Sequence, residues 1–390
     1  MRSISLSLLE PVSQPCFHPI LVCLSRHFRV ATAVMKLVLV LGCLTTTASA
    51  EKGLRFKLDG NATEILPAGY SNAQILGFKR SGEMISVRPS EIENPVVTNR
   101  FVPFSQSEAR GELLREFGKS YEVTGTGSYL VVHPKGYRDL WANRFEQLHR
   151  SMTHFFRTRG YPMKKSKFPL IGIVFHSKSQ YQAYCRRVLK YSAEDAIGLY
   201  MENTNRIYLF DATQGQGTQS HRWEQNLSTV MHEVAHQTAF NTGIHVRRSR
   251  TPGWVVEGLG CLFEAKGIYD TSKFKRREDR VSVSRLQRFR KSSIDDVEDD
   301  LMSLVSSDKL FKREALNAYA TSWALTFYLS ERRPREYVRY LKMVAKHEPF
   351  DGYSSSERVA EFSKVYGRDF RKLAMELVRY MRDIRVPKES

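Results

Sequence analysis

Two histidines and a glutamate near the middle of the chain have the spacing of a metal-dependent hydrolase site. Residues 232–236 read His-Glu-Val-Ala-His. On a helix, His232 and His236 lie one turn apart on the same face, so both imidazoles can bind one metal ion. Glu233 is then placed to take a proton from a water molecule that the metal activates. We therefore predict a metal site, and the alternative is a structural helix with surface histidines.

A second stretch with metal-binding character follows soon after the first. Residues 254–264 read Trp-Val-Val-Glu-Gly-Leu-Gly-Cys-Leu-Phe-Glu, directly after Pro252 and Gly253. A helix that begins there would place Glu257 in its first two turns, where its carboxylate can turn toward the histidines. Catalytic zinc normally has three protein ligands and an open position. The small residues Gly258 and Gly260 would let this helix approach the histidine helix closely.

These motifs resemble those of a known group of enzymes. Trp-x-x-Glu-Gly, with a further glutamate seven residues after the first, is similar to the second motif of gluzincin metallopeptidases, the thermolysin and zinc-aminopeptidase type. The resemblance implies that Glu257 is the third zinc ligand and that Glu264 orients a histidine. With the strands expected at 170–175 and 205–211 and the His-Gln-x-x-x-Asn-x-Gly run at 236–243, residues 105–345 look like an uncharacterised family of exported, peptidase-MA-like proteins.

A tyrosine further along is a candidate donor for the negative charge of a tetrahedral intermediate. Residues 317–327 resemble the helix on which aminopeptidase-type gluzincins carry such a tyrosine, which implies that Tyr319 is catalytic. Alternatively, Tyr319, Trp323 and Phe327 are spaced by four and form one stripe that faces the core. We leave both interpretations open; if Tyr319 belongs to the core, His245 and Arg247 are the next candidates.

A shorter resemblance concerns substrate binding. Residues 198–203, Gly-Leu-Tyr-Met-Glu-Asn, are similar to the Gly-x-Met-Glu-Asn sequence of zinc aminopeptidases, with one residue inserted. The resemblance implies that Glu202 and Asn203 hold the amino terminus of a substrate. A hairpin turn that leads into the strand expected at 206–210 explains the same residues, and we favour the turn.

Composition limits the classes of protein to which the chain can belong. It has 390 residues, 42% of them hydrophobic, and a net charge of +19. This length predicts more than one domain, and the lack of any run of eighteen apolar residues excludes a multi-span membrane protein. The basic residues are spread along the chain without aromatic platforms, so we expect no specific nucleic-acid partner. We expect solvated helix faces, with some attraction to an anionic envelope surface.

The start of the chain has the pattern of a signal peptide. A lysine follows Met35, then a short apolar run and an Ala-Ser-Ala cleavage site that ends at Ala50. We expect residues 1–50 to be a leader, with Met35 as a candidate initiator, and the mature protein to be periplasmic, envelope-associated or secreted, without a transmembrane span. The alternatives are a buried helix and a lipidated Cys43. After the leader, Cys185 and Cys261 remain, as one disulfide or as two buried thiols.

The expected fold is α+β. We predict a small β-rich module at 51–104, a zincin-like catalytic core of mixed sheet plus active-site helix at 105–270, and an all-helical lobe at 271–390. The apolar run at 169–175 is typical of a strand buried on both faces. The strand at 206–210 could bind an extended peptide along its edge.

The sequence thus predicts an exported zinc-dependent peptidase with a peptide or protein substrate. Zn²⁺ and Glu233 would carry the hydrolysis of the peptide bond. Two rivals remain at this stage. One is a non-catalytic envelope-binding or scaffold protein that keeps a zincin fold, and the other is a metal-dependent hydrolase of a non-peptide amide or ester.

Overall fold

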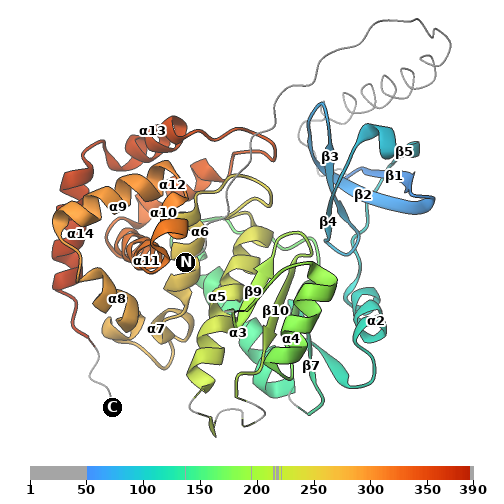
Figure 1. Cartoon of the computed structure of the whole chain (residues 1–390), viewed down its shortest axis with the longest axis horizontal. Coiled ribbons are helices and arrows are strands. Elements are labelled where there is room, and N and C mark those ends of the chain that lie inside the picture. Colours follow the sequence, from blue (N-terminus) through green and yellow to red (C-terminus); the bar gives the residue numbers. More distant parts are fainter. Residues whose placement is uncertain are drawn as a thin grey trace, which may run out of the picture.

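The fold is mixed α+β, with a β-rich N-terminal part and a helical C-terminal part (Figure 1). The computed structural model describes residues 51–386 apart from 137, 195, 214–215, 217–218 and 221. The predicted leader, with Met35 and Cys43, lies outside the described residues. Among the helices that are described, none is both long enough and apolar enough to cross a membrane.

The N-terminal part is a five-stranded antiparallel sheet. Its strands are β1 (Gly53–Leu58), β2 (Asn61–Tyr70), β3 (Ile75–Lys79), β4 (Met84–Val87) and β5 (Glu93–Thr98), in the order β4-β3-β2-β1-β5. A short 3-10 turn, Pro89–Glu91, joins the last two strands. Apolar side chains from several of the strands form a small core of the sheet's own, which includes Leu54, Ile65 and Ile75.

The second sheet is mixed. It contains β6 (Tyr121–Gly125), β7 (Tyr129–Pro134), β8 (Leu170–Phe175), β9 (Gly198–Met201) and β10 (Arg206–Phe210), in the order β6-β7-β8-β10-β9. The three inner strands are parallel, and β6 and β9 pair antiparallel at the two edges. The prediction that 206–210 offers a free edge is therefore wrong, because β10 is paired on both sides. The edge strand is β9.

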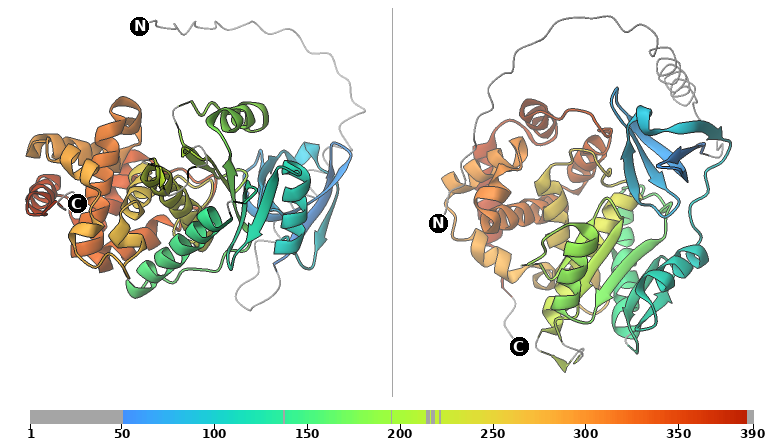
Figure 2. Two further views of the ribbon diagram at one scale, coloured as in Figure 1. Left: turned by 90° about the horizontal axis from the view of Figure 1, so that it is seen from below. Right: turned by 45° about the vertical axis from the view of Figure 1, so that its right-hand side comes forward.

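Helices cover both faces of this mixed sheet (Figure 2). On one face lie α2 (Gln106–Phe117) and α4 (Lys178–Tyr184), which continues as a π-helical turn at Cys185–Leu189. On the other face lie α3 (Arg138–Thr158) and α5 (Trp223–Thr242). All six residues of β8 are buried, as its continuous apolar run predicts.

The C-terminal part consists of helices arranged around one central helix, α11 (Ala315–Arg332). The others are α6 (Gly253–Phe263), α7 (Lys266–Tyr269), α8 (Val283–Phe289), α9 (Ile294–Ser306), α10 (Lys309–Arg313), α12 (Pro334–Val344), α13 (Ser355–Tyr366) and α14 (Phe370–Arg382), with a 3-10 turn at Glu278–Arg280. One hydrophobic core runs from α3 and α5 into these helices, so packing is continuous across residue 270. The predicted domain boundaries stay a prediction.

Two local features refine the expectations from the sequence. Gly258 faces α11 rather than α5, because a Cβ atom there would overlap Thr326 and lie 2.6 Å from the Ser322 carbonyl oxygen. The expectation that Gly258 lets this helix approach the histidine helix closely is therefore wrong.

The two cysteines that follow the predicted leader, Cys185 and Cys261, are both buried and free, so the alternative of two buried thiols holds.

Candidate metal centre

The two histidines come from the middle of α5. This helix packs through Val230, Val234 and Ala235 into the main core, and it ends at Gly243, whose φ of 87° is the left-handed conformation typical of a helix C-terminus. His232 and His236 therefore share a face, with ring centroids 4.5 Å apart and the rings nearly perpendicular. Their Nε2 atoms are 2.9 Å apart. This separation brings two nitrogen donors to one point.

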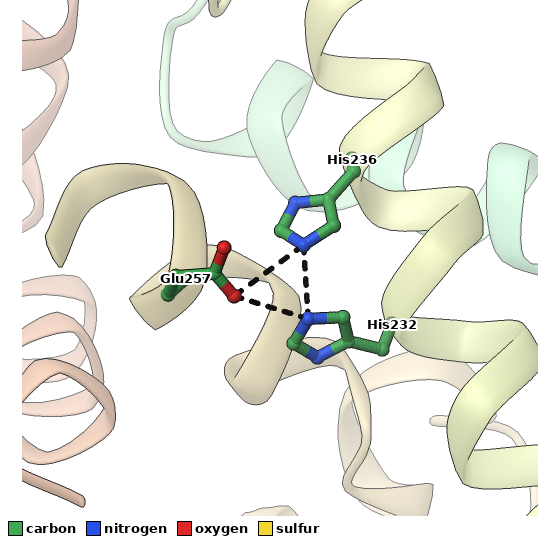
Figure 3. A group of neighbouring side chains, drawn as sticks. All are labelled: His232, His236 and Glu257. Atoms are coloured by element: carbon green, nitrogen blue, oxygen red, sulfur yellow. Dashed lines mark hydrogen bonds and ion pairs between the residues drawn. The ribbon is translucent and has the colours of Figure 1, made fainter. Parts of the chain in front are cut away.

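Helix α6 adds a carboxylate to the pair. Oε2 of Glu257 is 3.3 Å from Nε2 of His232 and 3.6 Å from Nε2 of His236, and Figure 3 shows the three side chains turned toward one another. Zinc bonds to nitrogen and oxygen are about 2.0–2.2 Å long, so the edges of a tetrahedral site are about 3.3 Å. The three distances scatter around that value. The donor set and its spacing therefore fit a zinc ion.

The close approach of α6 depends on a glycine. A Cβ atom at Gly260 would lie 2.7 Å from Cε1 of His232 and 2.9 Å from both ring nitrogens. The imidazole therefore rests directly on the backbone of α6. The sequence predicted a close approach at this position, and here the contact is with the side chain of His232 itself.

The second ring nitrogen of His232, Nδ1, contacts the carboxylate of Glu264. Nδ1 of His232 is 2.8 Å from Oε1 of Glu264, and Arg285 of α8 donates to both oxygens of Glu264, at 2.6 and 3.2 Å. A histidine that donates from Nδ1 presents Nε2 as the lone-pair donor, which is the tautomer needed to bind a metal. The structure thus brings Glu264 to the position that the resemblance implies.

Neighbouring groups shift the pKa values of two members of this cluster. Burial alone would raise the pKa of Glu257, but His236 and His232 beside its carboxylate lower it well below the usual range. Burial alone would lower the pKa of His232, but Cys261, Glu257 and Glu264 around the ring raise it. A buried carboxylate that stays charged beside two imidazoles is suited to bind a cation.

Glu233 points toward the edge of the mixed sheet. The backbone N–H of Tyr200, in β9, donates to Oε2 of Glu233 at 2.7 Å. Its carboxylate is therefore fixed between the histidine helix and the edge strand. The other carboxylate oxygen, Oε1, makes no hydrogen bond to any residue that the structure describes, so it can accept a proton from a reactant.

Tyr319 differs from the rest of its predicted stripe. Trp323 and Phe327 are fully buried and stack at 5.5 Å, which places them in the core. Tyr319, one turn earlier, is only partly buried and lies against Phe311 and beneath the Arg285 guanidinium. Burial, and then the charge of Glu257, raise the pKa of Tyr319. The charge of the cluster thus acts on the Tyr319 hydroxyl, whereas Trp323 and Phe327 are core residues.

Glu202 and Asn203 lie in the turn between β9 and β10. Oε2 of Glu202 accepts the backbone N–H of Arg248 at 3.1 Å, and the carbonyl of Asn203 accepts the N–H of Met84 at 2.7 Å. The turn favoured from the sequence is therefore present, and burial raises the pKa of Glu202. His245 is fully buried against Phe240, which makes it a less accessible oxyanion donor than Tyr319.

Two contributors to the site were not found by sequence reasoning. Arg285 reaches Glu264 from α8, and in the sequence it is one of many arginines in a basic helical region. Tyr200 contributes only its backbone N–H, for which a side-chain motif gives no signal. Both depend on tertiary packing between elements that are distant in the chain.

Residues 226–351 match the model of a protein family of unknown function, DUF1570, and this range contains the histidine pair, Glu257, Glu264, Arg285 and Tyr319 but not Tyr200. None of the curated proteins compared with the chain matches it. A crystal structure of a functionally unknown conserved protein mutant from Bacillus anthracis str. Ames matches with a TM-score of 0.35 and 10% identity, over 86% of this chain and 71% of that one.

Proposed function

We propose that the protein is a zinc-dependent peptidase with a zincin-like core, of the gluzincin type. The observation that supports this most directly is the triangle of His232, His236 and Glu257 donor atoms, with sides of 2.9, 3.3 and 3.6 Å. Two imidazoles and one carboxylate are the ligand set of catalytic zinc sites that keep one position open. A purely structural zinc site would normally close all four positions with protein ligands.

The side chains around the triangle have distinct roles in this proposal. A bound zinc ion would polarise the scissile carbonyl and lower the pKa of water. Glu233 takes the proton from the attacking water and delivers it to the leaving amine. Tyr319 donates a hydrogen bond to the oxyanion, and Glu264 holds the ring of His232 in the binding tautomer.

A peptide is the substrate that the neighbouring backbone suits best. The edge strand β9 lies beside Glu233, and a sheet edge is where an extended peptide can add as a further strand. The signal-like leader would deliver this activity outside the cytoplasm, where an anionic envelope surface would attract the basic protein. These points favour a peptide over other amides and esters.

Metal analysis and one substitution test the proposal. We expect about one zinc ion per chain in protein purified without chelators, because the cluster supplies three ligands. Glu233→Gln should keep the zinc and lower hydrolysis of a peptide library by about 10²–10⁴-fold, the usual share of general-base catalysis. The matched control is Glu112→Gln on the exposed face of α2, which should change neither quantity. Zinc-loaded protein that hydrolyses no peptide would favour the scaffold alternative instead.

A further inference from the structure

A cavity of about 940 Å³ lies between α3 and the segment that follows α6. One face of α3, from Asn143 to Thr158, and Arg159 directly after the helix form its floor. Residues 267–272, Arg280 and the β6–β7 turn at 125–127 form the rest of its lining. Since no ligand of the candidate metal centre lies among these residues, the cavity is a separate site. We call it the α3 groove.

The floor of the α3 groove is polar over most of its length. The residues of α3 that line it follow the three- and four-residue spacing of a single helix face. Those with uncharged amide or hydroxyl groups are Asn143, Gln147, Ser151 and Thr158. From the first to the last of these the helix rises by about 22 Å. A groove of this length fits an extended ligand with many hydrogen-bonding groups better than it fits a single ion.

One end of the α3 groove carries two arginines that share one carboxylate. Nη1 of Arg280 donates to Oε1 of Glu331 at 2.9 Å, and Nη2 of Arg159 lies 3.8 Å from the same oxygen. Both arginines line the groove, whereas Glu331 does not. Burial lowers the pKa of Arg159, the charge of Glu331 raises it, and the charge of Arg280 lowers it further. Two positive charges thus face one negative charge at this end.

The two arginines differ in how far their donors are used. Arg159 is held in place, because its Nη1 donates to the Phe155 carbonyl at 3.2 Å and its guanidinium lies 3.6 Å from the centroid of the Phe155 ring. Arg280 uses only Nη1 in its contacts with the residues that the structure describes. Its Nε and Nη2 groups form the fork that binds a carboxylate through two parallel hydrogen bonds. This fork is available to a ligand.

The other charged side chains of the lining already have partners. Nε of Arg150 donates to Glu146 at 2.9 Å, and this pair lies toward the opposite end of α3. Oδ1 of Asp270 accepts the hydroxyl of Ser272 at 2.7 Å, and within the described part of the chain Asp270 forms no ion pair with Arg280. The surplus positive charge of the arginine end is therefore left for a ligand to neutralise.

We propose that the α3 groove binds an acidic oligosaccharide, with a carboxylate on Arg280 and Arg159 and with sugar hydroxyls along α3. Amide and hydroxyl side chains suit sugar hydroxyls because both can donate and accept hydrogen bonds. The large apolar side chains of the lining, Phe155, Ile268 and Tyr269, are almost completely buried. The groove therefore offers little apolar surface to the side chains of a peptide. This inference does not depend on the proposed peptidase function.

The test is isothermal titration of the full-length protein with three probes. Trigalacturonate carries carboxylates on a sugar chain, maltotriose is an uncharged sugar chain, and triglutamate carries carboxylates on a peptide. We expect trigalacturonate to bind at least about tenfold more tightly than either of the others, since charge-assisted hydrogen bonds and sugar hydroxyls act together only in this probe. Equal affinity for triglutamate would overturn the saccharide assignment, and trigalacturonate that fails to bind would overturn the site.

Substitutions in the α3 groove show whether the probe binds there. Arg280→Gln removes the free fork and should weaken trigalacturonate binding by about tenfold or more. Gln147→Ala, which suits a helix, should weaken it about threefold by removing one amide from the floor. The matched control is Arg276→Gln, because Arg276 lies outside the groove, is 74% exposed and pairs with Asp279.

The control should bind trigalacturonate as tightly as the wild type. Equal losses in Arg276→Gln and Arg280→Gln would mean that net charge alone attracts the probe, which would overturn the site. Wild-type affinity in Gln147→Ala would overturn the placement of the sugar chain along α3, and this variant leaves both arginines in place. Zinc content and peptide hydrolysis are measured separately, so failure of the proposed function leaves this test unaffected.

Discussion

His232 is the residue on which most of the site's contacts converge. One ring nitrogen faces Glu257 and His236, the other meets Glu264, and the face of the ring rests on Gly260. Each neighbour fixes a different degree of freedom of the imidazole: its tautomer, its direction and its distance from α6. A ligand held in this way loses little conformational entropy when it binds a metal.

The contact between His232 and Glu264 can be tested by removing its charge. In Glu264→Gln, the amide is a weaker acceptor than the carboxylate, so the ring of His232 is less firmly oriented and less basic. We expect zinc affinity to fall by about 10–100-fold, the usual effect of losing such a partner. Chelator competition measures this directly. Glu298→Gln on α9, a partly buried glutamate that pairs with Arg371, serves as a control. Equal affinities in the two variants would contradict the role of Glu264.

Tyr319 offers a second test at the scale of a single hydroxyl. Tyr319→Phe should keep zinc and lower kcat by about 10²–10³-fold, as expected when one oxyanion donor is lost. Tyr328→Phe, on the same helix, removes a hydroxyl that is bound to Glu376 at 3.0 Å and should leave turnover unchanged. Steady-state kinetics with matched zinc content compares the two. If both variants are fully active, Tyr319 belongs to the core stripe instead.

At the scale of elements, the site depends on the distance between α5 and α6. Gly260→Ala should push the His232 ring away, because the new Cβ would lie 2.7–2.9 Å from three of its ring atoms. We expect zinc affinity to fall about tenfold or more, while the better helix propensity of alanine, about 1 kcal/mol, offsets much of the strain on folding.

The control for that substitution is Gly111→Ala on α2. The nearest atom to a Cβ there is Nη1 of Arg115 at 3.7 Å, so the change gains helix propensity without a clash. It should raise the free energy of unfolding by about 0.5–1 kcal/mol and leave zinc binding unchanged. Isothermal titration and thermal melts separate the two effects. Unaltered zinc affinity in Gly260→Ala would show that the helices can separate freely.

The elements themselves were largely predictable, because each has a local signal. The helix of His232 and His236 ends at its glycine, the helix after Pro252 begins where expected, and β8 is the buried strand that its apolar run indicates. Strand order was not predictable in the same way. The position of β10 inside the sheet depends on β9, a four-residue strand whose pairing is decided by tertiary contacts. The direction of Gly258 likewise depends on where α11 packs.

For the whole molecule, the first test concerns export. The signal-like segment that ends at Ala50 predicts a mature chain that begins at Glu51. Intact-mass analysis of envelope or secreted material, from expression that starts at Met35, would show this terminus. A first residue of lipid-modified Cys43 would establish a lipoprotein instead, and a full-length chain inside the cell would contradict export altogether.

The sequence predicts a separate N-terminal module, whereas in the structure this sheet is attached to the rest of the chain by specific contacts. The sheet has a small core of its own, which its alternating strands made predictable. Its attachment through Phe168 and Arg247 was not, because a phenylalanine before a strand and an arginine after a helix give no signal of a partner more than sixty residues away. The core of the sheet stabilises the sheet itself, whereas the contacts of Phe168 and Arg247 join its unfolding to that of the rest of the chain.

Phe168→Ala tests that attachment. Phe168 is buried between Phe78 and Phe101, at ring distances of 5.7 and 6.4 Å, so truncating it removes the centre of the contact. We expect a loss of about 3–5 kcal/mol, as for other buried phenylalanines. Because the sheet keeps its own core, calorimetry should then show it melting separately and earlier. Phe362→Ala, deep among the C-terminal helices, should instead lower the main transition without separating the sheet. A single transition in Phe168→Ala, shifted as in the control, would mean that the hydrogen bonds from Arg247 to Gly82 and from Met84 to Asn203 are enough to couple the sheet to the rest of the molecule.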